Sequence, residues 1–142
     1  MKKILVLLIF TLAVSFVYSQ TANLTIKIMG IHNPIGIMNF AVYDNAENYD
    51  KSKDYFIGES IPVESLDFEY VFHDLPYGNY AISLFHDEDE NKELNTNWIG
   101  MPKELFGFSN DAKAKMGPPD FIDASFEIIG DMEMIINLVD LL

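Results

Sequence analysis

The chain alternates apolar and polar side chains with a period of two over most of its length. Leu24, Ile26 and Ile28 alternate with Thr25 and Lys27, and similar runs occupy 38–43, 66–73, 80–85, 124–128 and 134–138. Successive side chains of a β-strand point to opposite faces, so each run predicts a strand with one buried face. Turn-forming residues, among them Asn-Pro, Pro-Tyr-Gly and Gly-Asp, separate the runs. The pattern predicts an all-β fold, a single antiparallel β-sandwich of about seven strands.

The apolar faces of these runs predict the core, and two stretches interrupt the pattern. We expect the following side chains to be buried: Phe40, Phe68, Ile82, Leu84, Phe126 and Ile136. Residues 45–58 are polar and predict a short helical turn. Residues 98–119 form a longer loop that carries Trp98, Phe106 and Phe108. Its aromatic content predicts that the loop is ordered against the sandwich.

Residues 86–97 read HDEDENKELNTN and predict a cation site. Asp87, Asp89, Asn91, Glu93 and Asn95 occupy alternate positions, which correspond to positions 1, 3, 5, 7 and 9 of a calcium-binding loop. In such loops side-chain oxygens at positions 1, 3 and 5 and the backbone carbonyl at position 7 bind the ion. The spacing therefore favours Ca²⁺ as the bound ion.

Two positions depart from a complete calcium loop. Position 6 is normally Gly, because its backbone φ is positive, and here it is Lys92. Position 12 is normally a bidentate Glu, and here it is Trp98. The strand pattern before Asp87 also excludes a helix–loop–helix motif. We predict a calcium-binding turn at a strand end, completed by water or by Glu104; a solvated acidic turn without metal is the alternative.

The N-terminus predicts export. Two lysines precede an apolar stretch at 4–17, and small residues stand at the cleavage positions before Gln20, as in a secretory signal. The predicted domains are a signal peptide at 1–19 and one sandwich domain at 20–142. The expected location is periplasmic, cell-surface or secreted, without membrane insertion after cleavage.

The charge limits the classes of binding partner, and the absence of cysteine limits how the fold can be stabilised. Two of the nine lysines precede residue 20, so the remainder has seven lysines and 22 Asp and Glu residues, a net charge of −15. So acidic a surface excludes nucleic acid as a partner and favours divalent cations or basic partners. The chain has no cysteine, so an exported form is held by its core, or by its core and a metal.

Two motifs carry a family resemblance. The segment 72–80, FHDLPYGNY, matches F-x-x-L-P-x-G-x-Y, a hairpin motif of transthyretin-like and carboxypeptidase-regulatory-like sandwich domains. A second, longer series of motifs consists of Tyr80-Ala81, His86-Asp87, Asn95-Thr96-Asn97, Pro102-Lys103-Glu104, Gly107-Phe108-Ser109-Asn110, Gly117-Pro118-Pro119 and Asp123-Ala124. This series resembles the bacterial exported family called domain of unknown function 2141. The resemblance implies an exported sandwich of transthyretin-like or Ig-like type. Typical members have Gly where this chain has Lys92.

Two functions remain open at this point. The first is a calcium-stabilised, exported binding or surface-associated module whose ligand is a peptide, a glycan or an envelope protein. Its ligand-binding residues would be His86, Trp98 and Phe108, beside the acidic turn. The second is a small extracytoplasmic hydrolase that uses His86 with neighbouring carboxylates. The chain lacks the G-x-S-x-G, H-E-x-x-H and phosphate-loop motifs and a cysteine nucleophile, so catalysis is the alternative and not the first choice.

Overall fold

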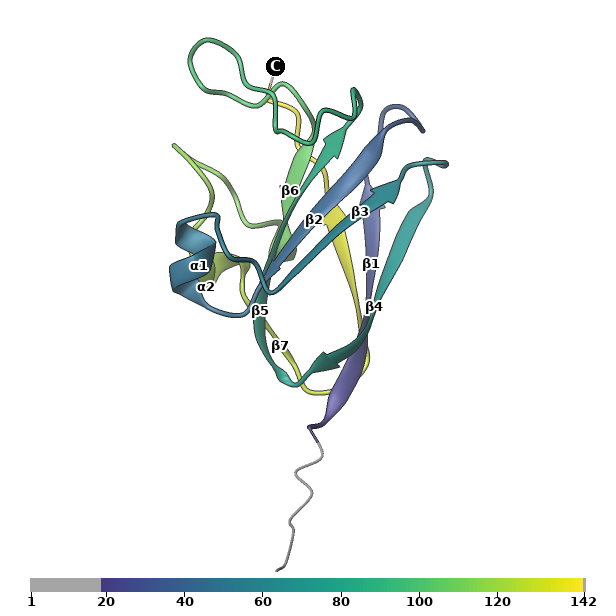
Figure 1. The fold of residues 1–142 in the computed structure, drawn as a ribbon, viewed down its shortest axis with the longest axis vertical. Coiled ribbons are helices and arrows are strands. Elements are labelled where there is room, and N and C mark those ends of the chain that lie inside the picture. The colour runs from purple at the N-terminus through teal and green to yellow at the C-terminus, as the bar shows by residue number, and fades with distance from the viewer. Residues whose placement is uncertain (1–18, 142) are drawn as a thin grey trace, which may run out of the picture.

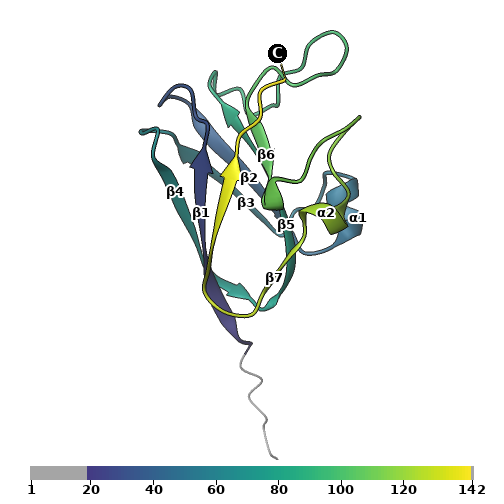
Figure 2. The same ribbon diagram turned by 180° about the vertical axis from the view of Figure 1, so that it is seen from behind.

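The computed structural model describes residues 19–141 and shows two β-sheets packed face to face (Figures 1 and 2). The strands are β1 (Thr21–Met29), β2 (Ile37–Tyr43), β3 (Ile57–Pro62), β4 (Phe68–Pro76), β5 (Gly78–Asp87), β6 (Phe106–Phe108), β7 (Phe126–Ile128) and β8 (Met132–Asn137). The short helices are α1 (Ala46–Asp50), the 3-10 helix η1 (Ser109–Asp111) and α2 (Phe121–Ala124). The predicted all-β sandwich with minor helix is confirmed.

The strands divide into a three-stranded sheet, β4-β1-β8, and a five-stranded sheet, β3-β2-β5-β6, in which β7 also pairs with β5. One edge of β5 pairs with β2 along its length. The other edge pairs with β7 near Gly78 and with β6 near Leu84. The centre of the five-stranded sheet is therefore β5, and this strand leads directly into the acidic turn.

The core lies between the two sheets. All six side chains predicted to be buried are at most 9% exposed. The Phe40 ring lies at its centre, with centroid distances of 5.6 Å to Phe72, 5.8 Å to Tyr70 and 6.2 Å to Phe68. Rings of the three-stranded sheet thus pack on a ring of the other sheet, and this contact joins the two layers.

The prediction of a hairpin around Tyr77, from the motif at 72–80, is wrong. β4 pairs with β1, whereas β5 pairs with β2, β6 and β7. Because both edges of β5 are occupied, β4 cannot pair with it. Tyr77 is instead a corner at which the chain passes from one sheet to the other, and its backbone N–H donates to the carbonyl of Gln20 at 2.9 Å.

One strand pair is parallel. β8 pairs with β1 in parallel, with Leu24 opposite Met132 and Ile28 opposite Ile136. After β7 the chain crosses between the sheets at the same end from which β1 starts, so β8 runs in the direction of β1 (Figure 2). The other strand pairs are antiparallel.

The long loop differs from its prediction at Trp98. Phe106 is buried in β6 and Phe108 is half-buried, as expected, but the Trp98 side chain is 95% exposed. The side-chain oxygen of Asn97 accepts the N–H groups of Ile99 and Met101 at 3.0 Å, which closes a tight turn. Trp98 lies at the tip of this turn and has no sheet beneath it.

Residues 1–18, most of the predicted signal peptide, lie outside the described residues. Among residues 19–141, no helix is long and apolar enough to span a membrane.

Candidate metal centre

Asp87 organises the turn that follows β5. Its side chain is fully buried, and its carboxylate accepts the backbone N–H of Asn91 at 3.2 Å and of Lys92 at 2.7 Å. A buried carboxylate requires such donors, because desolvation without hydrogen bonds is strongly unfavourable. To present these N–H groups, the turn places Glu90 at φ +58° and Lys92 at φ +66°. The positive φ expected at Lys92 is thus present without glycine.

The alternate polar residues of the turn face one another. Asp89 accepts the backbone N–H of Asn91 at 3.2 Å and the side-chain amide of Asn95 at 2.9 Å. The Asn91 amide group donates to Asp89 at 3.1 Å and to the Asn95 oxygen at 3.0 Å. Its own oxygen accepts the backbone N–H of Glu93 at 2.7 Å. Three of the five alternate residues, Asp89, Asn91 and Asn95, therefore share one side-chain network, and Asp87 and Glu93 join it through backbone N–H groups.

Glu104 reaches the same point from a different segment. Its Oε2 accepts the Asn95 backbone N–H at 2.9 Å. The two arms of the loop are held together by the bridge between Thr96 and Pro102 and by the bond from Lys103 N to Asn95 O at 2.8 Å. This pairing places Glu104 opposite the acidic turn.

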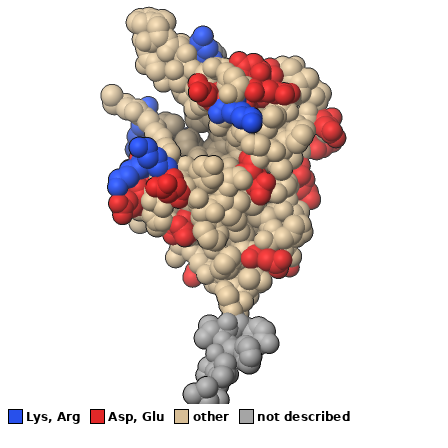
Figure 3. Space-filling model, viewed as in Figure 1, with Lys and Arg blue, Asp and Glu red and all other residues tan. Residues whose placement is uncertain are grey.

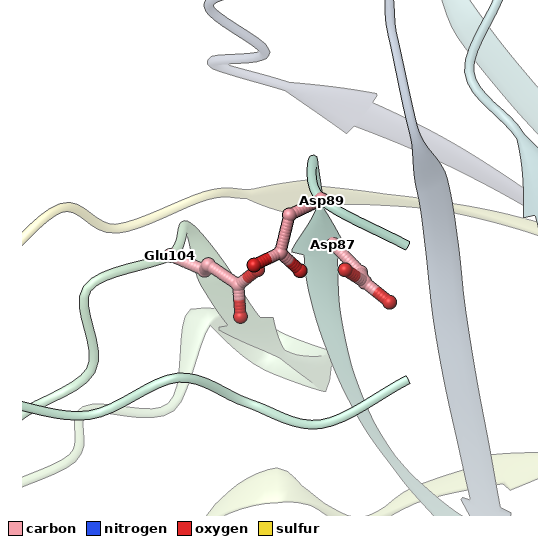
Figure 4. A group of neighbouring side chains, drawn as sticks. All are labelled: Asp87, Asp89 and Glu104. Atoms are coloured by element: carbon pink, nitrogen blue, oxygen red, sulfur yellow. The ribbon is translucent and has the colours of Figure 1, made fainter. Parts of the chain in front are cut away.

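Carboxylate oxygens of Asp87, Asp89 and Glu104 lie within 4.8 Å of one another. Figure 4 shows the side chains of Asp89 and Glu104 pointing toward one another, with Asp87 alongside at the end of β5. Oxygens that bind one Ca²⁺ at about 2.3–2.6 Å lie at most about 5 Å apart. The three carboxylates therefore have the spacing and the chemistry to hold a hard divalent cation.

The electrostatics of the cluster favour a cation. Partial burial raises the pKa of Glu104, and the nearby Asp87 and Asp89 raise it further, while the hydrogen bond from Asn95 opposes the rise. Burial and the like charges both disfavour the ionised carboxylate, because it has lost water and lies near other anions. A bound divalent cation would remove this repulsion.

The three residues predicted to bind a ligand lie in different environments. His86 is fully buried, and its Nε2 donates to the carbonyl of Ile35 at 2.7 Å. Its Nδ1 lies 3.9 Å from a Glu88 oxygen and has no hydrogen-bond partner among the described residues. Trp98 is exposed at its turn. Of the three, Phe108 lines a cavity.

That cavity was not predicted from the sequence. It has a volume of about 560 Å³ and lies against β5 and β6, between the loop segment 94–102 and the segment 114–118. The available signal was the set of apolar residues in otherwise polar loops, Leu94, Ile99 and Met116, which are 38%, 56% and 105% exposed. Such residues mark a surface that the chain itself does not cover.

Comparison with known proteins identifies the family and no individual relative. A family model described as an uncharacterized protein conserved in bacteria (DUF2141) matches residues 26–137. Neither the curated proteins nor the solved structures gave a match to the chain. The matched region contains the acidic turn, Glu104 and seven of the eight strands completely. The chain therefore belongs to this bacterial family, domain of unknown function 2141.

Proposed function

We propose that the protein is an exported β-sandwich binding module in which Ca²⁺, held by Asp87, Asp89 and Glu104, stabilises the fold. The observation that carries the proposal is the convergence of three carboxylates from two segments within 4.8 Å. Residues 87–97 alone contain five carboxylates and one lysine, a local charge of −4. This density of like charge is unfavourable unless a cation offsets it.

The cation would also fix one wall of the cavity. Segment 94–102 lies between the two parts of the site, since Asp89 precedes it and Glu104 follows it. Leu94, Ile99 and Met101 from this segment line the cavity. Binding of Ca²⁺ by both parts would close the base of the loop and hold these side chains against the sheet. The proposed role of the ion is therefore to order a ligand-binding surface as well as to stabilise the fold.

No observation favours the hydrolase alternative. A general base must come within hydrogen-bond reach of a substrate. The His86 ring is fully buried and bonded to a backbone carbonyl. Its bond to Ile35 holds the segment before β2 against the end of β5, which is a structural role.

Thermal unfolding tests the proposal. At ten times the dissociation constant, Ca²⁺ adds about 1.4 kcal/mol to the free energy of unfolding. For a domain of this size the melting temperature rises by about 5 °C. The purified protein is melted in chelator and in about 10 mM Ca²⁺, a concentration that suits the weak affinity of extracellular calcium modules.

Two variants with the same charge change make the test specific. Asp89→Asn removes a proposed ligand and should abolish the shift. Asp67→Asn alters an exposed turn before β4 and should leave the shift intact. Identical melting of the wild type with and without Ca²⁺ would refute the proposal, and so would equal shifts in the two variants.

A further inference from the structure

The cavity beside the metal centre has the form of a small-molecule site. Its volume of about 560 Å³ falls within the range of roughly 300–1,000 Å³ that is usual for ligand pockets. Figure 3 shows a hollow between the two projecting loops on this face. The floor is formed by the outer face of the five-stranded sheet, including Phe85 and Phe108.

The walls are mainly aliphatic. Leu94, Ile99 and Met101 line one side, and Met116 lines the other. These apolar side chains, two of them flexible methionines, can pack on a linear hydrocarbon chain. Side chains with a hydroxyl or ammonium group are a minority of the lining, so it suits an apolar chain better than a glycan; they are Tyr43, Tyr49, Ser52, Ser83, Thr96 and Lys115.

The one charged side chain among the described residues that line the cavity is basic, although the adjoining depression includes Asp111. The chain has 22 carboxylates, yet none belongs to the described residues that line this cavity, whereas Lys115 does. Lys113 lines an adjoining depression that shares Phe106 and Phe108. Figure 3 shows lysine side chains on both sides of the hollow, with acidic side chains next to them.

These lysines are available to a ligand. Among the described residues, Lys113 and Lys115 form no ion pair within 4 Å, whereas Lys27 pairs with Glu133 at 2.8 Å and Lys51 with Glu47 at 2.7 Å. A lysine on the lining without an internal ion-pair partner is complementary to an anion.

One end of the cavity also carries a polar group without a partner. Tyr49 of α1 lines the cavity and is 2% exposed, and its hydroxyl has no hydrogen-bond partner among the described residues. Burial raises the pKa of Tyr49, and the nearby carboxylates of Asp50, Asp120 and Asp123 raise it further, so the hydroxyl stays protonated and can donate. Ser52, also at this end, belongs to the lining. The polar end is therefore near α1 and Lys115.

We propose that the cavity binds a free long-chain carboxylate, a monomeric anionic amphiphile of the fatty-acid type. Its acyl chain lies between the two loops on β5 and β6, and its carboxylate lies at the α1 end beside Lys115 and Tyr49. This site goes beyond the proposed cation centre: the sheet and the 114–118 segment form its floor and far wall, and the cation would order only the opposite wall, segment 94–102.

A chain-length and charge series tests the site by calorimetric titration. The probes are octanoate and decanoate, with butyrate, decanol and decyltrimethylammonium as comparisons, each below its micelle-forming concentration. Chelator is present throughout, which prevents calcium soaps and separates this test from that of the cation centre. Decanoate should bind up to about fifteen-fold tighter than octanoate, since each buried methylene contributes up to about four-fold. It should also bind more tightly than decanol, and butyrate should not bind measurably.

Decyltrimethylammonium provides the sharpest contrast. The net charge of the protein attracts cations in general. Binding of this cation at least as tight as that of decanoate would overturn the proposal, and so would equal binding of decanoate and decanol.

Two pairs of variants locate the site. Ala114→Trp fills the cavity and should abolish decanoate binding, whereas Ile122→Trp adds the same ring at an exposed position outside it. Lys115→Gln should weaken decanoate binding about three-fold, and Lys27→Gln on the other sheet should not change it. Lys115 is exposed, so its variant stays informative even if Ala114→Trp unfolds the protein. Unchanged decanoate binding in Lys115→Gln, or in a folded Ala114→Trp, would overturn the proposal.

Discussion

At the scale of single residues, Asp87 and Glu104 contribute to the acidic cluster in different ways. Asp87 is fully buried and accepts two backbone N–H groups, so its carboxylate shapes the turn as well as facing the proposed ion. Glu104 is half-buried and accepts the single N–H of Asn95. Removing its charge therefore changes cation affinity with less effect on the turn.

Glu104→Gln should weaken Ca²⁺ binding more than Glu88→Gln. The two substitutions remove the same charge from neighbouring parts of the loop. The carboxylate of Glu88, however, lies outside the cluster and contacts Asn33 at 3.3 Å. Calorimetric titration of both variants measures the difference, and slower proteolysis between Lys103 and Lys115 in Ca²⁺ provides a second readout. Equal losses would show that only general negative charge attracts the ion.

The raised pKa of Glu104 predicts a pH dependence. The folded state binds this proton more tightly than the unfolded state, whose pKa is near the ordinary value of 4.5. The resulting stability is present below that value and is lost as the pH rises through the raised pKa. In chelator, the melting temperature of Glu104→Gln minus that of the wild type should therefore increase as the pH rises from about 4 to about 7. A constant difference between about pH 4 and about pH 7 would contradict the raised pKa.

The sequence predicted the parts of the candidate site that depend on residues close together in the chain. Alternate spacing in one segment identified Asp87, Asp89, Asn91 and Asn95, because a local turn brings together residues close in sequence. Glu104 was inferred as the completing ligand, and it meets the turn through the pairing of Thr96 with Pro102. The cavity was missed, because it forms between two loops and a sheet that are distant in sequence.

At the scale of elements, Ser109 joins three parts of the fold. It is fully buried in η1; its Oγ accepts the backbone N–H of Ile82 in β5 at 2.9 Å and donates to the carbonyl of Ala124 in α2 at 2.5 Å. These bonds have no local sequence signal, because they join Ser109 to residues 27 and 15 positions away in the chain.

Ser109→Ala should destabilise the protein by about 1–3 kcal/mol, because it leaves buried backbone groups of β5 and α2 without partners. Ser125→Ala is the matched control, since its hydroxyl is not buried and makes one bond of 3.3 Å to Ile122. We expect that control to change stability by less than about 0.5 kcal/mol. Urea unfolding of both variants measures the two values. A Ser109→Ala variant as stable as Ser125→Ala would show that the Ser109 bonds contribute nothing.

Two strands lacked a clear sequence signal. β3 contains Gly58 and ends at Pro62, and both residues disfavour a strand in isolation. It is an edge strand paired with β2 alone, where Pro is tolerated. β6 has only three residues and forms because β5 offers it an open edge. Tertiary pairing, and not local propensity, determines both strands.

At the scale of the whole molecule, the contact between the two sheets holds a chain that has no disulfide. Phe40 is the central residue of this contact, with three aromatic neighbours on β4. Period-two patterning predicted this core, because every strand that crosses it has one apolar face. The corner at Tyr77 and the parallel β8 were not predicted, because alternation does not specify which strands pair.

Phe40→Ala should lower the free energy of unfolding by about 3–5 kcal/mol. Phe56→Ala removes the same ring at a position that is 45% exposed and should lower it by less. Chemical denaturation with both variants gives the comparison. Similar stability of the two variants would mean that the sheets are not joined at Phe40.

The central claim is that one Ca²⁺ binds at Asp87, Asp89 and Glu104, and direct titration of Ca²⁺ into the purified protein tests it. We expect one saturable site per chain, with a dissociation constant of about 10⁻⁴–10⁻³ M, as in extracellular calcium modules. We also expect Asp89→Asn to lose the site and Asp67→Asn to retain it. Heats that do not differ from injection into buffer, or equal binding by Asp89→Asn and the wild type, would contradict it.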